Sequence, residues 1–279
     1  MLQQTRVAVV IEYYRKFLQR FPTVSKLAKA RSASVLAAWS GLGYYRRALM
    51  LHAAANKIVG EHHGEFPRTS QELCLLPGIG RYTASAIASI AFGEPVAAVD
   101  GNVERVLQRI LGRRGNCNEL WRVANNLVSK RRPGDFNQAM MELGATVCSP
   151  RQPECVRCPV AKLCATGGAL EDLPRKNRLK REIYYSLDLR NGSVFLIQRP
   201  RHASLMPGMW ELPEVAPGRD NSPESFTLRH SITVTDYKVR ILRQPAPVGA
   251  EGRFVSRSQL KRLPLTGLSR KILRAASVM

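Results

Sequence analysis

Four cysteines crowd into one short stretch of the chain, and their spacing constrains the local fold more than any other sequence feature. They follow the pattern Cys-x6-Cys-x2-Cys-x5-Cys, at Cys148, Cys155, Cys158 and Cys164. Four thiolates this close together can ligate one tetrahedral zinc ion or one [4Fe–4S] cluster. Zinc sites usually contain two Cys-x2-Cys pairs, whereas this stretch contains one, so the spacing favours a cluster. Cys74 lies among leucines and is expected in the core.

The loop closed by these cysteines carries positive charge. Arg151 lies between the first two cysteines, and Arg157 and Lys162 follow nearby. A loop held in this way can present Arg151 to a phosphate group, because guanidinium groups bind phosphate well. An ordinary solvated face would also carry three cations, so both interpretations stay open.

The charge of the whole chain points to a polyanionic partner. Lys and Arg number 43 against 21 Asp and Glu, which gives a formal net charge of +22. The charge is spread along the chain and no basic amphipathic tail is evident, so nucleic acid is favoured over anionic lipid. No apolar run approaches the ~18 residues that a membrane span needs. We therefore expect a cytoplasmic, monomeric protein that does not bind membranes.

Helical periodicity dominates the first part of the chain and strand patterns dominate the last. Apolar residues recur at helical spacing from Val7 onward, and residues 1–164 continue as a series of expected helices. Residues 165–182 are small and then charged, which is typical of a linker. Two strand-like segments joined by Asn191-Gly192 then predict a hairpin, and residues 231–242 predict a further strand. The expected fold is a mainly α region followed by a small α/β domain at residues 183–279.

A glycine-containing turn joins two of the expected helices within residues 69–92. Thr69 and Glu72 form a capping-box pattern ahead of the segment Leu-Pro-Gly-Ile-Gly. Gly78 and Gly80 would let backbone N–H groups approach an anion, and the next helix would add its positive end. A turn that only joins helices would also use glycine.

Asp100 follows an apolar run and precedes an expected helix. The simplest role for such an aspartate is to cap that helix. This role is compatible with catalysis, because a capping carboxylate at the mouth of a cleft remains available to a substrate.

Together these motifs resemble the endonuclease III superfamily, in which a helix-hairpin-helix element, a Val-Asp-Gly-Asn-Val segment and four cysteines occur in this order. The segments MLQQTR, GLGYYRRA and FNQAMMELGA narrow the resemblance to the MutY-type adenine DNA glycosylases. Residues 205–213, LMPGMWELP, are more weakly similar to that family's C-terminal Nudix-like module. The resemblance implies a helix-hairpin-helix glycosylase domain, an iron–sulfur loop at residues 148–164 whose four cysteines hold a [4Fe–4S] cluster, and a Nudix-like domain.

The resemblance also implies a reaction. The family removes adenine mispaired with 8-oxoguanine or guanine from double-stranded DNA, after the base has been flipped out of the stack. Asp100 would stabilise the oxocarbenium-like sugar, and Tyr82 would orient groups beside it. Tyr82 stands where lyases of the superfamily carry a lysine, so the enzyme is expected to be monofunctional.

Further residues are implied in DNA and substrate contacts. Gln3 and Gln4 would probe the duplex, and Gln138 would lie near the adenine. Tyr44 would wedge beside 8-oxoguanine, although core packing is an alternative for it and for Tyr45. The full set of expected contacts is Leu2, Gln3, Gln4, Thr5, Tyr44, Gly78, Gly80, Asn102, Gln138, Arg151 and Thr233.

The expected Nudix-like module departs from the family pattern. It lacks the glutamate-rich helix of Nudix hydrolases, so we expect no pyrophosphohydrolase activity. The family reads 8-oxoguanine with a Phe-Ser-His loop, and here the matching stretch after His230 offers Thr233 in place of the serine. The loop histidine is absent, which predicts weaker discrimination of 8-oxoguanine from guanine. A plain strand is the alternative for these residues.

In the family, the acid that protonates adenine is a glutamate two positions ahead of the methionine that matches Met1. None of Glu12, Glu61 and Glu142 replaces it by motif. We expect that the gene begins upstream of Met1, and that residues 1–279 alone excise adenine very slowly. A non-catalytic DNA-binding protein of the same fold is the alternative. A thymine or uracil mismatch glycosylase or a lyase is disfavoured by the C-terminal module, and a lyase also by Tyr82.

Overall fold

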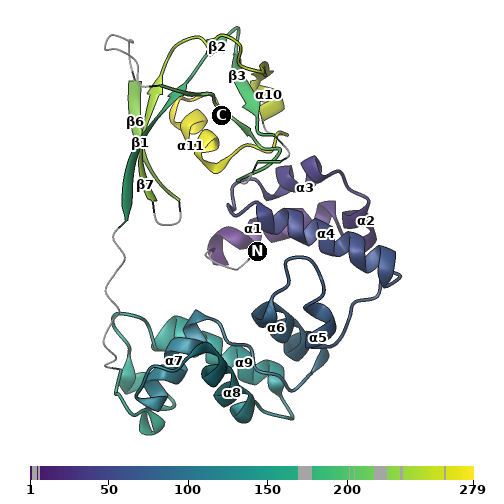
Figure 1. Cartoon of the computed structure of the whole chain (residues 1–279), viewed down its shortest axis with the longest axis vertical. Coiled ribbons are helices and arrows are strands. Elements are labelled where there is room, and N and C mark those ends of the chain that lie inside the picture. The colour runs from purple at the N-terminus through teal and green to yellow at the C-terminus, as the bar shows by residue number, and fades with distance from the viewer. Residues whose placement is uncertain are drawn as a thin grey trace. The chain divides into compact units, whose positions relative to one another are not determined.

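The computed structural model describes the chain apart from residues 2–4, 6, 169–177, 201, 204, 217–224, 233, 234 and 261. Helices occupy the first part of the sequence and strands the last (Figure 1), as the sequence patterns predict. Two compact units result, and each is described by itself. One combines Met1–Val59 with Arg175–Met279, and the other is Gly60–Pro174. None of the described helices is long and apolar enough to span a membrane.

The first unit begins with four helices around a shared apolar core. They are α1 (Val7–Arg20), α2 (Val24–Ala28), α3 (Ser32–Trp39) and α4 (Arg46–Glu61). Phe17 of α1 packs edge-on against Trp39 of α3, with ring centroids 6.0 Å apart. Met209, from the far end of the sequence, is fully buried in the same cluster. The C-terminal part of the chain therefore helps to form the core of these helices.

Among the described residues, two four-stranded sheets and two helices make up the C-terminal part of this unit. The first sheet has the order β5-β1-β7-β6, in which β1 and β7 are parallel, and the second pairs β3 with β2, β4 and β8. The strands are β1 (Leu179–Ser186), β2 (Leu189–Arg190), β3 (Ser193–Gln198), β4 (Trp210–Glu211), β5 (Glu214–Val215), β6 (Ser225–Ile232), β7 (Thr235–Leu242) and β8 (Gly252–Ser256). The helices are α10 (Arg257–Leu260) and α11 (Gly267–Ala275).

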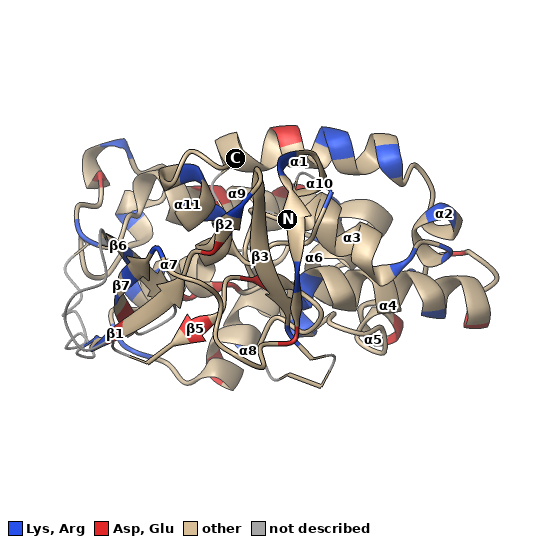
Figure 2. Cartoon of the chain, turned by 90° about the horizontal axis from the view of Figure 1, so that it is seen from above, with Lys and Arg blue, Asp and Glu red and all other residues tan. Residues whose placement is uncertain are grey.

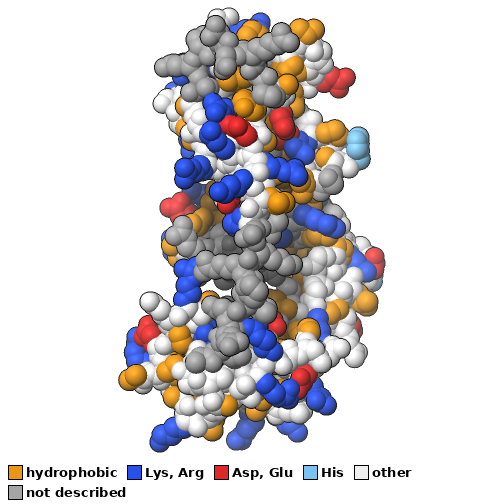
Figure 3. Space-filling model, turned by 60° about the vertical axis from the view of Figure 1, so that its left-hand side comes forward, with side chains coloured by type: hydrophobic (Ala, Val, Ile, Leu, Met, Phe, Trp, Pro, Cys, Tyr) orange, Lys and Arg blue, Asp and Glu red, His pale blue; other side chains and the backbone are white. Residues whose placement is uncertain are grey.

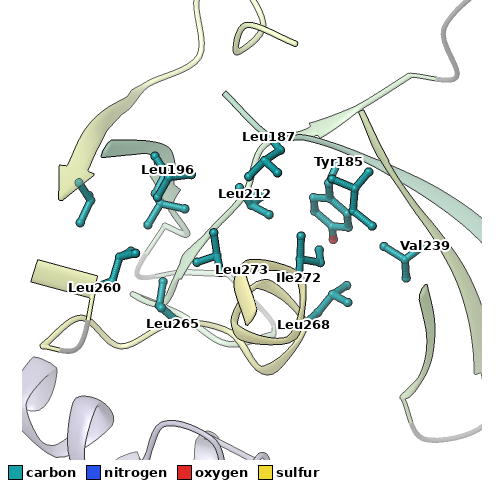
Figure 4. Close-up of a cluster of buried hydrophobic side chains, with 13 residues drawn as sticks. Tyr185, Leu187, Leu196, Leu212, Val239, Leu260, Leu265, Leu268, Ile272 and Leu273 are labelled. Atoms are coloured by element: carbon teal, nitrogen blue, oxygen red, sulfur yellow. The ribbon is translucent and has the colours of Figure 1, made fainter. Parts of the chain in front are cut away.

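The apolar face of α11 closes the core of these sheets. Leu268, Ile272 and Leu273 project from it toward Leu212 and Tyr185 (Figure 4), and all belong to one buried cluster. Because α11 repeats apolar residues at helical spacing, one face can meet the sheets while Lys271 and Arg274 stay exposed.

The structure confirms one predicted hairpin and corrects another prediction. Asn191 and Gly192 join β2 to β3 with φ of 46° and 70°, as a type I′ turn requires. The single strand expected at residues 231–242 is wrong, because β6 ends at Ile232 and pairs antiparallel with β7. Alternating apolar and polar residues run through the connection, and no glycine or proline in it marks the reversal.

The expected linker at residues 165–182 is shorter than predicted. The Thr166 hydroxyl donates to the carbonyl oxygen of Arg109 (3.2 Å), so the start of this segment belongs to the cysteine loop. At its other end, β1 already begins at Leu179 and pairs with β7. Residues 169–177 lie outside the described part of the chain.

The second unit is helical. It contains α5 (Ser70–Leu73), α6 (Arg81–Phe92), α7 (Gly101–Leu111), α8 (Cys117–Leu127) and α9 (Pro133–Glu142), then a π-helix η1 (Leu143–Val147) and two 3₁₀ turns, η2 (Cys155–Arg157) and η3 (Ala161–Leu163). Leu107 and Leu120 are buried between α7 and α8. Cys74 is exposed, so the prediction of a core cysteine is wrong. Because α5 ends at Leu73, Cys74 caps it and turns outward.

Candidate active site

The turn between α5 and α6 brings backbone N–H groups to the surface. The predicted capping box is present, because Thr69 accepts from the N–H of Glu72 while the Glu72 carboxylate accepts from the N–H of Thr69. Gly78 has φ +76°, a left-handed conformation that strains other residues. Gly80 is the N-cap of α6, and a Cβ built on it would meet no atom within 4 Å. Neither backbone strain nor packing therefore explains the glycine at position 80.

Asp100 is the N-cap of α7, as predicted. Its Oδ1 accepts from the backbone N–H groups of Asn102 (2.9 Å) and Val103 (2.8 Å). Its Oδ2 accepts from the side-chain amide of Asn102 at 3.3 Å. Three donors therefore fix the orientation of this half-buried carboxylate at the positive end of a helix.

Tyr82 lies on the first turn of α6 and is half-buried. Burial, reinforced by the negative charge of Asp100, raises the pKa of its phenol, so the side chain is a neutral hydrogen-bond donor at neutral pH. The hydroxyl donates to the sulfur of Met141 at 3.2 Å. Thioether sulfur is a weak acceptor, so a stronger acceptor can take this donor.

An extended segment leads from α6 to Asp100, and the buried amide of Asn137 holds it. Asn137 is 1% exposed, and its Oδ1 accepts from the N–H of Ala98 at 2.9 Å. Its Nδ2 donates to the carbonyl oxygen of Val96 (2.9 Å) and to the Ser89 hydroxyl (2.8 Å). One side chain of α9 therefore ties α6 to the segment that delivers the carboxylate.

Arg105 connects the start of α7 to the cysteine loop. Its guanidinium donates to Asn102 Oδ1 (3.0 Å), to the carbonyl oxygen of Gly144 (2.5 Å) and to that of Cys148 (2.9 Å). A Cβ on Gly144 would lie 2.7 Å from Asn102 Cβ, so only glycine permits this approach of η1 to α7. Asp100, Asn102 and Cys148 thus belong to one continuous network.

The four cysteines line one small cavity of about 40 Å³, together with Arg109 and Gly168. Arg109 is buried and donates to the sulfur of Cys148 (3.2 Å) and to the carbonyl oxygens of Ser149 (2.8 Å) and Pro150 (3.0 Å). A Cβ on Gly168 would lie 2.7 Å from Cys155 Sγ, so the chain passes close around the thiols.

These thiols suit a metal or cluster by their chemistry. Burial opposes ionisation of Cys164, but hydrogen bonds with the Thr166 side chain and with backbone N–H groups outweigh it and lower the pKa of this thiol. Arg109 supplies a positive charge beside Cys148. Across the described residues, no three Cys, His, Asp or Glu side chains already stand in metal-binding geometry. The cysteines therefore fit a thiolate-bound group in composition and enclosure, and the loop would tighten around it.

The other predicted residues are divided between the two units. Gln138 is exposed on α9, next to the buried Asn137, and Arg151 is exposed on the cysteine loop. Thr5 and Tyr44 belong to the other unit, where the Arg47 guanidinium donates to Thr5 Oγ1 at 3.5 Å. Tyr44 is 51% exposed whereas Tyr45 is buried, so core packing holds for Tyr45 only. Leu2, Gln3, Gln4 and Thr233 lie outside the described residues.

Asn137 and Arg105 did not emerge from the sequence patterns. A buried asparagine has no periodic signal, because helical spacing marks apolar residues and this one is polar. Asn137 lies between Pro133, which starts α9, and two methionines. These apolar neighbours could have indicated that its side of the helix faces the core.

Comparison with known proteins finds one matching family and several curated relatives. Residues 1–127 match the family described as HhH-GPD superfamily base excision DNA repair protein. The adenine DNA glycosylase of Homo sapiens is 53% identical over 171 residues, which cover 59% of this chain and 31% of the human protein. That of Schizosaccharomyces pombe is 35% identical over 279 residues, covering 81% of this chain and 60% of the yeast protein. The chain thus spans less than two thirds of the length of either relative.

Solved structures match the helical part. A thermostable thymine-DNA glycosylase aligns with a TM-score of 0.55 and 31% identity, over 59% of this chain and 78% of that one. A non-covalent endonuclease III–DNA complex aligns with a TM-score of 0.53 and 28% identity, over 59% of this chain and 78% of that chain. The fold of the helical part is therefore endonuclease III-like.

We predict that Asn137→Ala destabilises the protein by roughly 2–4 kcal/mol, because it leaves the buried N–H of Ala98 and the carbonyl of Val96 unpaired. Urea denaturation followed by circular dichroism measures this. The matched control is Asn125→Ala, which removes one hydrogen bond to Ala97 from an exposed side chain and should cost about 1 kcal/mol. Equal losses in the two variants would contradict the prediction.

Proposed function

Because residues 1–127 match the HhH-GPD superfamily of base excision DNA repair proteins and the curated relatives are adenine DNA glycosylases, we propose that the chain is a DNA N-glycosylase that removes adenine mispaired with 8-oxoguanine or guanine. The observation that carries the proposal is the fixed carboxylate of Asp100 beside Tyr82. Breaking the N-glycosidic bond develops positive charge on the sugar, and a preoriented carboxylate stabilises that charge. The substrate follows from the curated relatives, which are adenine DNA glycosylases.

Tyr82 is proposed to position the sugar or the attacking water. Its phenol is neutral and donates only to a weak acceptor, Met141, so a substrate oxygen can replace that sulfur. A phenol cannot form a Schiff base with the sugar, as the lysine of a lyase does. This supports a monofunctional glycosylase that leaves an abasic site.

Duplex DNA is the proposed partner, bound by a monomer in the cytoplasm. The net charge of +22 supports attraction to the phosphate backbone. Basic side chains occur on helices and strands alike (Figure 2), and the face seen in Figure 3 carries them with sparser acidic side chains among them. The turn at Gly78–Gly80 is proposed to contact phosphate through its backbone N–H groups.

We propose that Cys148, Cys155, Cys158 and Cys164 hold a [4Fe–4S] cluster. When bound, the cluster would crosslink the loop that carries Arg151 and would take no part in hydrolysis. Arg109 would donate to the Cys148 thiolate, and Arg105 would link that cysteine to Asn102. The C-terminal sheets are proposed to be Nudix-like and to distinguish 8-oxoguanine from guanine.

Asp100→Asn is expected to slow adenine excision at least a hundredfold, because the amide cannot stabilise the sugar cation. Asparagine also caps helices, so stability should change by less than about 1 kcal/mol. Single-turnover assays on duplexes with an adenine:8-oxoguanine pair measure the rate. In the family that the sequence resembles, a glutamate two positions ahead of the methionine that matches Met1 protonates adenine, so the assay uses residues 1–279 preceded by the matching human segment.

The control for this assay is Asp135→Asn, which removes an exposed carboxylate paired with Arg132 and should leave the rate unchanged. Excision by Asp100→Asn at the parent rate would exclude Asp100 as the stabilising carboxylate. Tight binding without excision by the extended parent would favour the non-catalytic alternative.

Gly80→Ala is predicted to weaken duplex binding about tenfold while leaving the melting temperature unchanged. The added methyl group meets no protein atom and φ is −89°, so the fold tolerates it, but the methyl would stand between the backbone and a phosphate. Fluorescence anisotropy at several salt concentrations reports the affinity. Gly60→Ala, which also points into open space, serves as the control. Unchanged affinity would remove the turn from the DNA interface.

Anaerobically purified protein should contain about four iron atoms and four acid-labile sulfides per chain. Cys158→Ser should lose them, whereas Cys117→Ser, which changes a cysteine outside the loop, should keep them. Elemental analysis and visible absorption are the measurements. A content of one zinc ion per chain without sulfide would show that the four cysteines form a zinc site instead of a cluster site.

A further inference from the structure

The loop between α3 and α4 has a backbone that needs support. Gly41 and Gly43 have φ of +113° and +74°, and Tyr44 has φ +48°, a left-handed conformation that costs a non-glycine residue free energy. Tyr44 is 51% exposed, and its ring packs under the Arg47 guanidinium at 5.0 Å. Its orientation therefore depends chiefly on the backbone of the loop. Strained residues persist where their surroundings hold them.

Helices of the same unit provide part of this support. The Tyr13 hydroxyl donates to the carbonyl oxygen of Ser40 (3.1 Å), and the indole N–H of Trp39 donates to that of Gly43 (3.1 Å). The Tyr13 hydroxyl also occupies the space beside Gly41, where a Cβ would lie 2.1 Å from it. These contacts fix the two ends of the loop.

The C-terminal part of the chain provides the rest, through contacts more than two hundred residues apart in sequence. The carbonyl oxygen of Leu265 accepts from the Ser40 hydroxyl (2.9 Å) and from the Tyr45 hydroxyl (3.3 Å). The Arg270 guanidinium donates to Ser40 Oγ at 2.7 Å. The Tyr45 hydroxyl in turn accepts from the N–H of Gly41 at 3.3 Å. We call Ser40, Tyr45, Leu265 and Arg270 the brace.

Ser40 and Tyr45 of the brace are buried, and Leu265 is attached to the C-terminal sheets. Ser40 is 2% exposed and Tyr45 is 3% exposed, so their hydroxyl groups have no access to water as an alternative partner. Leu265 belongs to the core of the C-terminal sheets. The residues on either side of it bond to Trp210 of β4, through the Pro264 carbonyl (2.8 Å) and the Thr266 N–H (2.9 Å). The acceptor that holds the loop is thus joined to β4 by an isolated β-bridge.

We propose that the C-terminal sheet region positions Tyr44 for insertion into DNA beside the damaged base, acting through the brace. Tyr45 and Ser40 are positioning residues in this inference, and Tyr44 is the residue that touches DNA. The inference rests on the proposed function and on the expectation from the family resemblance that Tyr44 wedges beside 8-oxoguanine. It adds a second task to the C-terminal region, apart from any contact of its own with the modified base.

The first measurement tests the brace without DNA. In Tyr45→Phe and in Ser40→Ala, hydrogen exchange of the amides at residues 41–45 should become about 2- to 10-fold faster, as expected for loss of one buried hydrogen bond. The matched control is Ser186→Ala, which removes a buried hydroxyl that donates to the carbonyls of Gln244 (2.9 Å) and Pro245 (3.1 Å). Exchange no faster than in this control would overturn the inference.

The second measurement is a double-mutant cycle on affinity for a duplex with an adenine:8-oxoguanine pair. Tyr45→Phe should weaken this affinity about 2- to 10-fold and leave affinity for undamaged duplex unchanged. In a Tyr44→Ala background the same change should have less than a twofold effect, because the brace then has nothing to position. A purely structural role would give the same loss in both backgrounds.

The outcomes separate the inference from the function on which it rests. If Tyr44→Ala weakens binding but Tyr45→Phe and Ser40→Ala do not, the positioning role of the brace is wrong, whereas the insertion of Tyr44 into DNA is still supported. A loss that persists undiminished in the Tyr44→Ala background also overturns it. If Tyr44→Ala itself leaves affinity unchanged, the wedge role is wrong and the inference falls with it.

Discussion

The position of Asp100 depends on the extended segment that precedes it. The backbone N–H and C=O groups of this segment are hydrogen-bonded without a neighbouring strand. Residues between α6 and α7 are not paired in any strand, yet Ala97 and Ala98 are buried. Buried N–H and C=O groups need partners, and the side-chain amides of Asn125 and Asn137 take the place of a neighbouring strand. An amide can both donate and accept, so Asn137 serves both groups at once. The position of the carboxylate at the start of α7 follows from this pairing.

Local signals were sufficient for the elements that local chemistry determines. The capping box at Thr69, the N-cap at Asp100 and the Asn191-Gly192 turn were predicted because each uses contacts between residues close in sequence. The reversal between β6 and β7 was missed, since no turn-forming residue marks it. Cys74 was misplaced because its apolar neighbours hide the fact that the helix has already ended.

The remaining features could not be predicted, because they join residues that the sequence keeps apart. The network from Asn102 through Arg105 to Cys148 depends on the approach of η1, which Gly144 permits. The brace joins Ser40 to Leu265, and neither residue carries a pattern that predicts a partner. The resemblance to the family supplies the residues that are proposed to meet the substrate, and the structure adds the residues that hold them.

The first unit is discontinuous, and this affects how the chain can fold during synthesis. The apolar core of α1 to α4 is completed by Met209, and its final loop is held by Leu265. A ribosome makes these helices well before the residues that complete them. During that interval the helices present an incomplete core to the cell, while the intervening unit has all of its own residues and can fold. Within residues 1–279, the apolar core of α1 to α4 is therefore the one that waits longest for its last residues during synthesis.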